Sequence, residues 1–177
     1  MPMTAEMRPS ESPPWGGPAQ WLEIQLRIES TLREANGSRE AWRRLATKIA
    51  DEIAAVSPLI ADVAAATCPW CPDPCCLRAR VWFDLKDLLV MHLTGRPAPP
   101  AQAILQRNDR CRYIGVRGCR LDRRDRPWIC TWYLCPTQKN RLRSDDRTIW
   151  ERLEERLCAI SAARKVLASE FLQAAVN

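Results

Sequence analysis

The residues of this sequence best suited to chemistry are its nine cysteines. Four of them fall within the run CPWCPDPCC at 68–76, and the other five are Cys111, Cys119, Cys130, Cys135 and Cys158. Thiols can pair as disulfides, bind metals or react as nucleophiles. Disulfides are the least favoured role, because the total is odd, the first 20 residues lack the apolar run of an export signal, and 177 residues suffice for a hydrophobic core.

We therefore interpret the clustered cysteines as metal ligands. Their spacings are C-x2-C-x3-C-C and then C-x7-C-x10-C-x4-C, which match neither the paired knuckles of a zinc ribbon nor a bacterial ferredoxin run. Adjacent side chains of an extended segment point to opposite sides, so Cys75 and Cys76 suit two metal positions or one polynuclear cluster. Thiolate ligands favour zinc or iron–sulfur, and the pattern leaves that choice open. Cys158 stands apart and is interpreted as an ordinary small residue.

Arginines crowd into the same part of the chain. Residues 107–126 hold eight arginines and three aspartates, within a protein whose net charge is +6. Arginine pairs well with phosphate, so nucleic acid is one candidate partner. The alternative is internal, because a thiolate-bound metal carries net negative charge that nearby arginines would offset. We favour the internal role, since the cysteines lie within the same stretch.

The elements that must position these cysteines are predicted to be helices. Apolar residues recur at helical spacing over 20–35, 39–56 and 77–93, and again after the SDD at 144–146. Between 108 and 141 no period persists, and we expect loops with one short strand or helical turn. The prediction is a mostly α fold, with helices around a central, cysteine-rich loop region that a metal stabilises. Residues 1–18 are expected to be a flexible tail, and 19–177 a single domain with its metal-binding core at about 68–136.

Three other side chains have functional alternatives. His92 is the only histidine, and its place on the apolar side of the 77–93 helix predicts a packed residue rather than a ligand. Asp84 and Asp87 lie near the cysteine run, where carboxylates can serve catalysis. We interpret them instead as part of a solvated helix face.

The cysteine pattern resembles the YkgJ-type family of zinc- or iron-chelating cysteine-cluster domains. The first run matches through Cys68, Cys71, Cys75 and Cys76, with one residue more than the family's C-x2-C-x2-C-C. The second motif, a cysteine, an aliphatic residue and Arg-Pro-x-x-Cys, matches through Cys119, Leu121, Arg126, Pro127 and Cys130, with Cys111 and Cys135 as the flanking cysteines. The resemblance covers about 68–136 and implies that these eight cysteines hold the metal, supported by Arg126 and Pro127.

The function expected from these residues is metal binding. We predict a protein that holds iron–sulfur or Zn²⁺ through up to eight cysteines, as a component of an enzyme that modifies a protein or a small molecule. The alternatives are a structural zinc module for protein or nucleic-acid interaction, and a metal carrier or redox sensor. Whether the protein is itself an enzyme stays open. No apolar run is long enough to span a membrane, so a cytoplasmic location is expected.

Overall fold

The computed structural model describes residues 13–35, 37–72, 77, 81–106, 109–116 and 118–176. Within them the prediction of a mostly helical protein is confirmed. The α-helices are α1 (Pro18–Glu34), α2 (Arg39–Thr67), α4 (Leu85–Leu93), α5 (Ile129–Trp132), α6 (Pro136–Asp145) and α7 (Arg147–Val176). The short elements are the 3-10 turns η1 (Cys68–Trp70) and η2 (Arg123–Asp125) and the strands β1 (Ile114–Gly115) and β2 (Gly118–Cys119).

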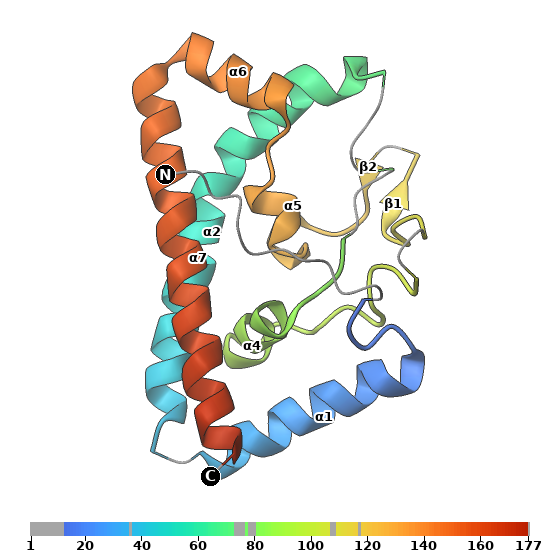
Figure 1. The fold of residues 1–177 in the computed structure, drawn as a ribbon, viewed down its shortest axis with the longest axis vertical. Helices are drawn as coiled ribbons and strands as arrows, with labels where there is room; N and C mark the ends of the chain where they lie inside the picture. Colours follow the sequence, from blue (N-terminus) through green and yellow to red (C-terminus); the bar gives the residue numbers. More distant parts are fainter. Residues whose placement is uncertain are drawn as a thin grey trace.

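Helices α2 and α7 form the frame of the molecule. They lie side by side and run in opposite directions along its long axis, with α6 across one end and α1 across the other (Figure 1). Trp42 donates its indole N–H to Glu170 at 3.0 Å, and Arg156 pairs with Glu52 at 3.1 Å. These contacts join the two helices outside the apolar seam.

The apolar stripes predicted for these helices form the core. The buried apolar residues of α2 and α7 recur at spacings of three, four or seven positions, as helical periodicity requires: Trp42, Ile49, Val56, Ile60, Val63, Trp150, Leu153, Leu157, Ile160, Leu167 and Phe171. The predicted end of the second helix at 56 is wrong, because α2 continues through Pro58 to Thr67. Proline removes one helical hydrogen bond, but the burial of Ile60 and Val63 beyond it favours continuation.

Helix α4 lies inside this frame and begins later than the predicted start at 77. Residues 81–84 have no regular secondary structure, and 78–80 lie outside the described residues. A reciprocal cap starts the helix. The backbone N–H of Asp87 donates to the side chain of Asp84 at 2.9 Å, and the backbone N–H of Asp84 donates to the side chain of Asp87 at 3.0 Å. The side chains of Leu88 and Leu89 are fully buried, so α4 supplies the centre of the core.

The loops between α4 and α5 lie along one side of the helices, with the short β1–β2 hairpin at their outer edge (Figure 1). Gln102 is fully buried and organises them, because its amide accepts the backbone N–H of Phe83 at 2.7 Å and donates to the carbonyls of Phe83 and Pro14 at 2.9 Å. Gly16 lies so close to the carbonyl of Leu105 that an added Cβ would be 2.8 Å away. The segment before α1 therefore packs against these loops from Pro13 onward, and residues 1–12 lie outside the description.

Candidate cysteine site and a buried ion-pair network

Most of the described cysteines proposed as ligands lie at the ends of elements or in loops. Cys68 begins η1 where α2 ends, Cys119 closes β2, Cys130 lies in α5, and Cys135 precedes the first residue of α6. Cys71 and Cys111 occupy loops, and Cys75 and Cys76 fall outside the described residues. The thiol-bearing positions therefore come from five separate segments, and their spacing depends on how those segments pack.

Arg123 of η2 lies within electrostatic range of three of these segments. Its guanidinium is near enough to Cys130, Cys119 and Cys68 for negative charge on those thiols to raise its pKa. Burial and the like charge of Arg126 act more strongly, so that the pKa of Arg123 is lowered from its usual value. One of its terminal nitrogens, Nη1, is buried without a hydrogen-bond partner. A half-buried cation within electrostatic range of thiols is an environment suited to anionic sulfur.

Gln138 of α6 joins Cys68 to a fourth cysteine, Cys135. Its Oε1 accepts the backbone N–H of Cys135 at 3.1 Å, and its Nε2 lies 3.5 Å from the Sγ of Cys68. The side chain is only 6% exposed. One buried amide therefore spans the end of α2 and the start of α6, two positions far apart in the sequence.

The residues proposed to support the ligands have structural tasks in the loop. Arg126 donates its Nε–H to the carbonyl of Leu121 at 3.1 Å, which closes the turn around η2. Pro127 is buried, and its carbonyl accepts the backbone N–H of Cys130 at 2.8 Å. Arg126 thus shapes the loop that carries Arg123, and Pro127 opens the turn that carries Cys130.

The predicted metal site itself stays a prediction. Within the described part of the chain, no group of three or more histidine, cysteine, aspartate or glutamate side chains is arranged to hold a metal ion. Two of the eight predicted ligands, Cys75 and Cys76, are outside that part. No disulfide joins two of the described cysteines. The described part of the chain therefore contains the predicted loops and six of the eight predicted ligands, and metal binding by them stays a prediction.

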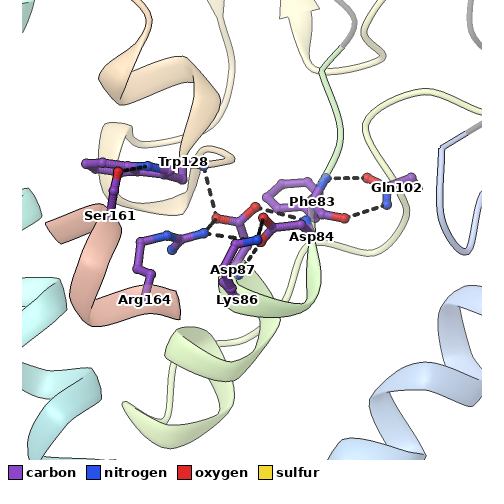
Figure 2. A network of polar contacts seen from close by, with 8 residues as sticks. All are labelled: Phe83, Asp84, Lys86, Asp87, Gln102, Trp128, Ser161 and Arg164. Atoms are coloured by element: carbon purple, nitrogen blue, oxygen red, sulfur yellow. Dashed lines mark hydrogen bonds and ion pairs between the residues drawn. The ribbon is translucent and has the colours of Figure 1, made fainter. Parts of the chain in front are cut away.

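A buried ion pair lies beside this region, and the sequence interpretation missed it. Arg164 of α7 is 2% exposed, and its Nη2 donates to Asp87 at 2.7 Å and to Asp84 at 3.2 Å (Figure 2). Placing Asp87 on a solvated face was wrong: its side chain is 6% exposed, because α7 covers this side of α4. A signal was present in the sequence, since Arg164 falls on the apolar stripe between Ile160 and Leu167. An arginine there requires a buried acid.

The two carboxylates respond differently to their surroundings. Burial raises the pKa of Asp87 to about 6, against the opposing attraction of Arg164. Burial also acts to raise the pKa of Asp84, but Arg164 and Lys86 outweigh it, so that this pKa is lowered. The Nζ of Lys86 lies 2.9 Å from the Oδ2 of Asp84. Asp84 is thus the better stabilised anion, and Asp87 is the acid that titrates nearer neutral pH.

This network reaches the cysteine region through Trp128. Asp87 Oδ1 accepts the backbone N–H of Trp128 at 3.0 Å, and the indole N–H of Trp128 donates to Ser161 of α7 at 3.2 Å. The guanidinium of Arg164 lies over the Trp128 ring, 5.4 Å from its centroid. Figure 2 shows the three elements joined by these contacts. Because Trp128 directly precedes α5, the network fixes the turn on which Cys130 lies.

The two remaining candidates occupy the places expected of them. The His92 side chain is 13% exposed and faces Glu29 of α1, with 3.7 Å between Nδ1 and Oε1, and burial lowers its pKa. This agrees with a packed residue at a helix contact. Cys158 is exposed on α7, away from the apolar stripe.

Comparison with known proteins identifies no relative of this chain. No family model, curated protein or solved structure matches the chain. None of the helices in the described residues combines the length and the apolar character needed to cross a membrane. What the protein does must therefore be argued from the site itself.

Proposed function

We propose that this protein binds a metal centre, zinc or iron–sulfur, through its clustered cysteines. The observation that carries the proposal is that Arg123 lies within electrostatic range of Cys68, Cys119 and Cys130, so that negative charge on these thiols would raise its pKa. Cys135 joins this group through Gln138. The remaining proposed ligands are Cys71, Cys75, Cys76 and Cys111.

The charge balance of the region supports an anionic occupant. Arg123 and Arg126 act on one another as like charges, and Nη1 of Arg123 is buried without a partner. A charged group with a buried, unpaired nitrogen is costly unless an anion offsets it. A metal held by thiolates carries net negative charge, which would supply that anion. The arginines of this stretch are then part of the site, as the internal interpretation of their charge predicts.

The number of cysteines supports more than one metal position. Eight thiols exceed the four that one zinc ion takes, and they suffice for two zinc sites or a polynuclear iron–sulfur cluster. A coordination position without cysteine would allow the centre to act on a substrate, as a component of an enzyme that modifies a protein or a small molecule. Full thiolate coordination would favour a structural module, a metal carrier or a redox sensor.

Anaerobic purification with metal analysis and a visible spectrum tests the proposal. We expect either about one or two zinc ions per chain and no colour, or iron with the visible absorption of a sulfur cluster. Changing Cys68, Cys119, Cys130 or Cys135 singly to serine should lower the metal content, whereas Cys158→Ser should not. A folded wild-type protein that contains no metal after anaerobic purification would contradict the proposal.

A second candidate is contact with single-stranded nucleic acid by a zinc-supported surface. Trp70 follows Cys68 in η1 and is 84% exposed, and Arg110 and Arg112 are also exposed. Exposed aromatic rings and arginines are the groups on which unpaired bases stack and to which phosphates bind. Fluorescence anisotropy with a labelled oligonucleotide should then show salt-sensitive binding that Trp70→Ala weakens. Equal binding by wild type and variant would exclude this role for Trp70.

A further inference from the structure

Gln138 occupies a place between two proposed ligands that its helix-capping role alone does not require. It is the third residue of α6, where glutamine commonly caps by accepting the N–H that precedes the helix. Its Oε1 does so with Cys135 at 3.1 Å. Gln20 caps α1 in the same way through Gly17 at 3.2 Å, at the surface of the protein. At α6 the amide is instead buried, and its nitrogen points to sulfur.

The orientation of this amide is settled by its partners. A backbone N–H can only donate, so the oxygen of Gln138 must face Cys135. The NH₂ group is then left toward the Sγ of Cys68, 3.5 Å away. Gln138 is therefore the hydrogen-bond donor to Cys68, and the sulfur is the acceptor. An N–H donor of this kind stabilises a thiolate more than a thiol, because the thiolate is the stronger acceptor.

We propose that Gln138 is a positioning residue of the cysteine site, which holds Cys68 and Cys135 together and donates a hydrogen bond to the Cys68 thiolate. This inference rests on the proposed metal binding for the role of the two ligands. Groups that hydrogen-bond to metal ligands fix their orientation and tune the centre, and their loss commonly weakens metal affinity by about 10- to 100-fold. If the centre is an iron–sulfur cluster, the same bond shifts its reduction potential upward.

Gln138→Glu removes the donor and places a negative charge beside the sulfur. Glutamate has the same shape and can still accept the N–H of Cys135, but as a carboxylate it cannot donate to the sulfur and it repels a thiolate. Gln20→Glu is the matched control, since it makes the same change at the same position of another helix cap. Far-UV circular dichroism of both variants checks that the helices are retained. If Gln138→Glu fails to fold, Gln138→Met, which is neutral and of similar length, replaces it.

Two measurements decide the inference. The first is competition for the bound metal by a chelator, in which we expect Gln138→Glu to lower affinity about tenfold and Gln20→Glu to leave it unchanged. The second is alkylation of the metal-free protein by iodoacetamide at neutral pH, followed residue by residue by mass spectrometry. Cys68 is exposed, so the reagent reaches it, and it should react several-fold more slowly in Gln138→Glu, since less of it is thiolate. Cys71, also exposed, is the internal reference and should keep its rate.

Failure of the inference about Gln138 can be distinguished from failure of the proposed metal binding. If the wild-type protein binds metal but Gln138→Glu matches Gln20→Glu in both measurements, the inference about Gln138 is overturned while metal binding stands. If the wild-type protein binds no metal, the proposed function falls together with the ligand role given to Gln138. The alkylation rates then still report whether the hydrogen bond to Cys68 forms.

Discussion

Arg164 and Asp87 meet in the interior of the protein, with 2.7 Å between Nη2 and Oδ1 and side chains that are 2% and 6% exposed. The same carboxylate oxygen accepts the backbone N–H of Trp128. A contact between α4 and α7 therefore also determines where the turn before Cys130 lies. The interior charges and the cysteine region are joined by one oxygen atom.

Removing the arginine of this pair should destabilise the protein strongly. Arg164→Met leaves Asp87 buried without its cation, and the loss of one partner of a buried pair costs about 3 to 5 kcal/mol in the free energy of unfolding. Urea unfolding at pH 7.5 measures it. Adding Asp87→Asn to Arg164→Met should recover part of the loss, because the orphaned charge is then removed as well.

The matched control is on the same helix. Arg156→Met removes an ion pair with Glu52 whose side chains are 48% and 39% exposed, and such pairs contribute under about 1 kcal/mol. Similar losses for Arg156→Met and Arg164→Met would show that burial of the Arg164 pair has no energetic importance.

The raised pKa of Asp87 predicts a pH dependence of stability. An acid whose pKa is higher in the folded chain retains its proton longer there than in the unfolded chain. The contribution of Asp87 is therefore fully present below its ordinary pKa of 3.8 and is lost as the pH rises through about 6. The lowered pKa of Asp84 acts with the opposite sign and below 3.8, outside this window.

Asp87→Asn tests this directly, since asparagine does not titrate. The difference in the free energy of unfolding between wild type and Asp87→Asn should shrink from about pH 4 to about pH 6, measured by urea unfolding in matched buffers. A difference that is constant over this range would show that Asp87 has the same pKa in both states.

Arg123 should matter to the metal centre and its neighbour Arg124 should not. Arg123→Gln removes a cation that lies within electrostatic range of the three thiols, and we expect affinity for the metal to fall about tenfold. Arg124 is 58% exposed and faces Asp122, so Arg124→Gln is a control of identical chemistry. Chelator competition measures both. Equal affinities for the two variants would exclude the charge-offsetting role of Arg123.

Pro58 should be a weak point of α2. It is exposed within the helix, and Pro58→Ala restores a backbone donor at a site where proline is unfavourable by about 3 kcal/mol. Part of this gain is offset by the greater freedom of the unfolded chain. We expect a net stabilisation of about 1 to 2 kcal/mol by thermal or urea unfolding. Pro18→Ala, at the first residue of α1 where proline fits, should give no gain.

The helices could be predicted because their evidence is local. The spacing of Trp42, Ile49 and Val56 is a helical stripe whatever the rest of the chain does. The continuation of α2 beyond Pro58 could not be predicted in this way, because it depends on Ile60 and Val63 finding a partner surface. Burial of Asp87 likewise depends on Arg164 of a helix far along the chain.

Part of the candidate site could likewise be predicted from the sequence, and part of it depends on packing. Residue types and spacing identified the cysteines, but neither predicts that Cys68 and Cys135 share one glutamine, since Gln138 carries no sequence signal beyond a helix cap. The approach of three thiols to Arg123 is a property of packing. The arrangement around Cys75 and Cys76 lies outside the described residues, so the complete ligand set stays a prediction.

The contact between Gln102 and Pro14 has a consequence for where the folding unit begins. The amide nitrogen of Gln102 donates one hydrogen bond to the carbonyl of Pro14 and one to the carbonyl of Phe83. The segment before α1 therefore satisfies a donor in the middle of the protein. A truncated protein that starts at Pro18 would lose the carbonyl that accepts one of those hydrogen bonds. The short segment before α1 is thus part of the packed interior. Shortening the chain there would loosen the loops that carry the cysteines.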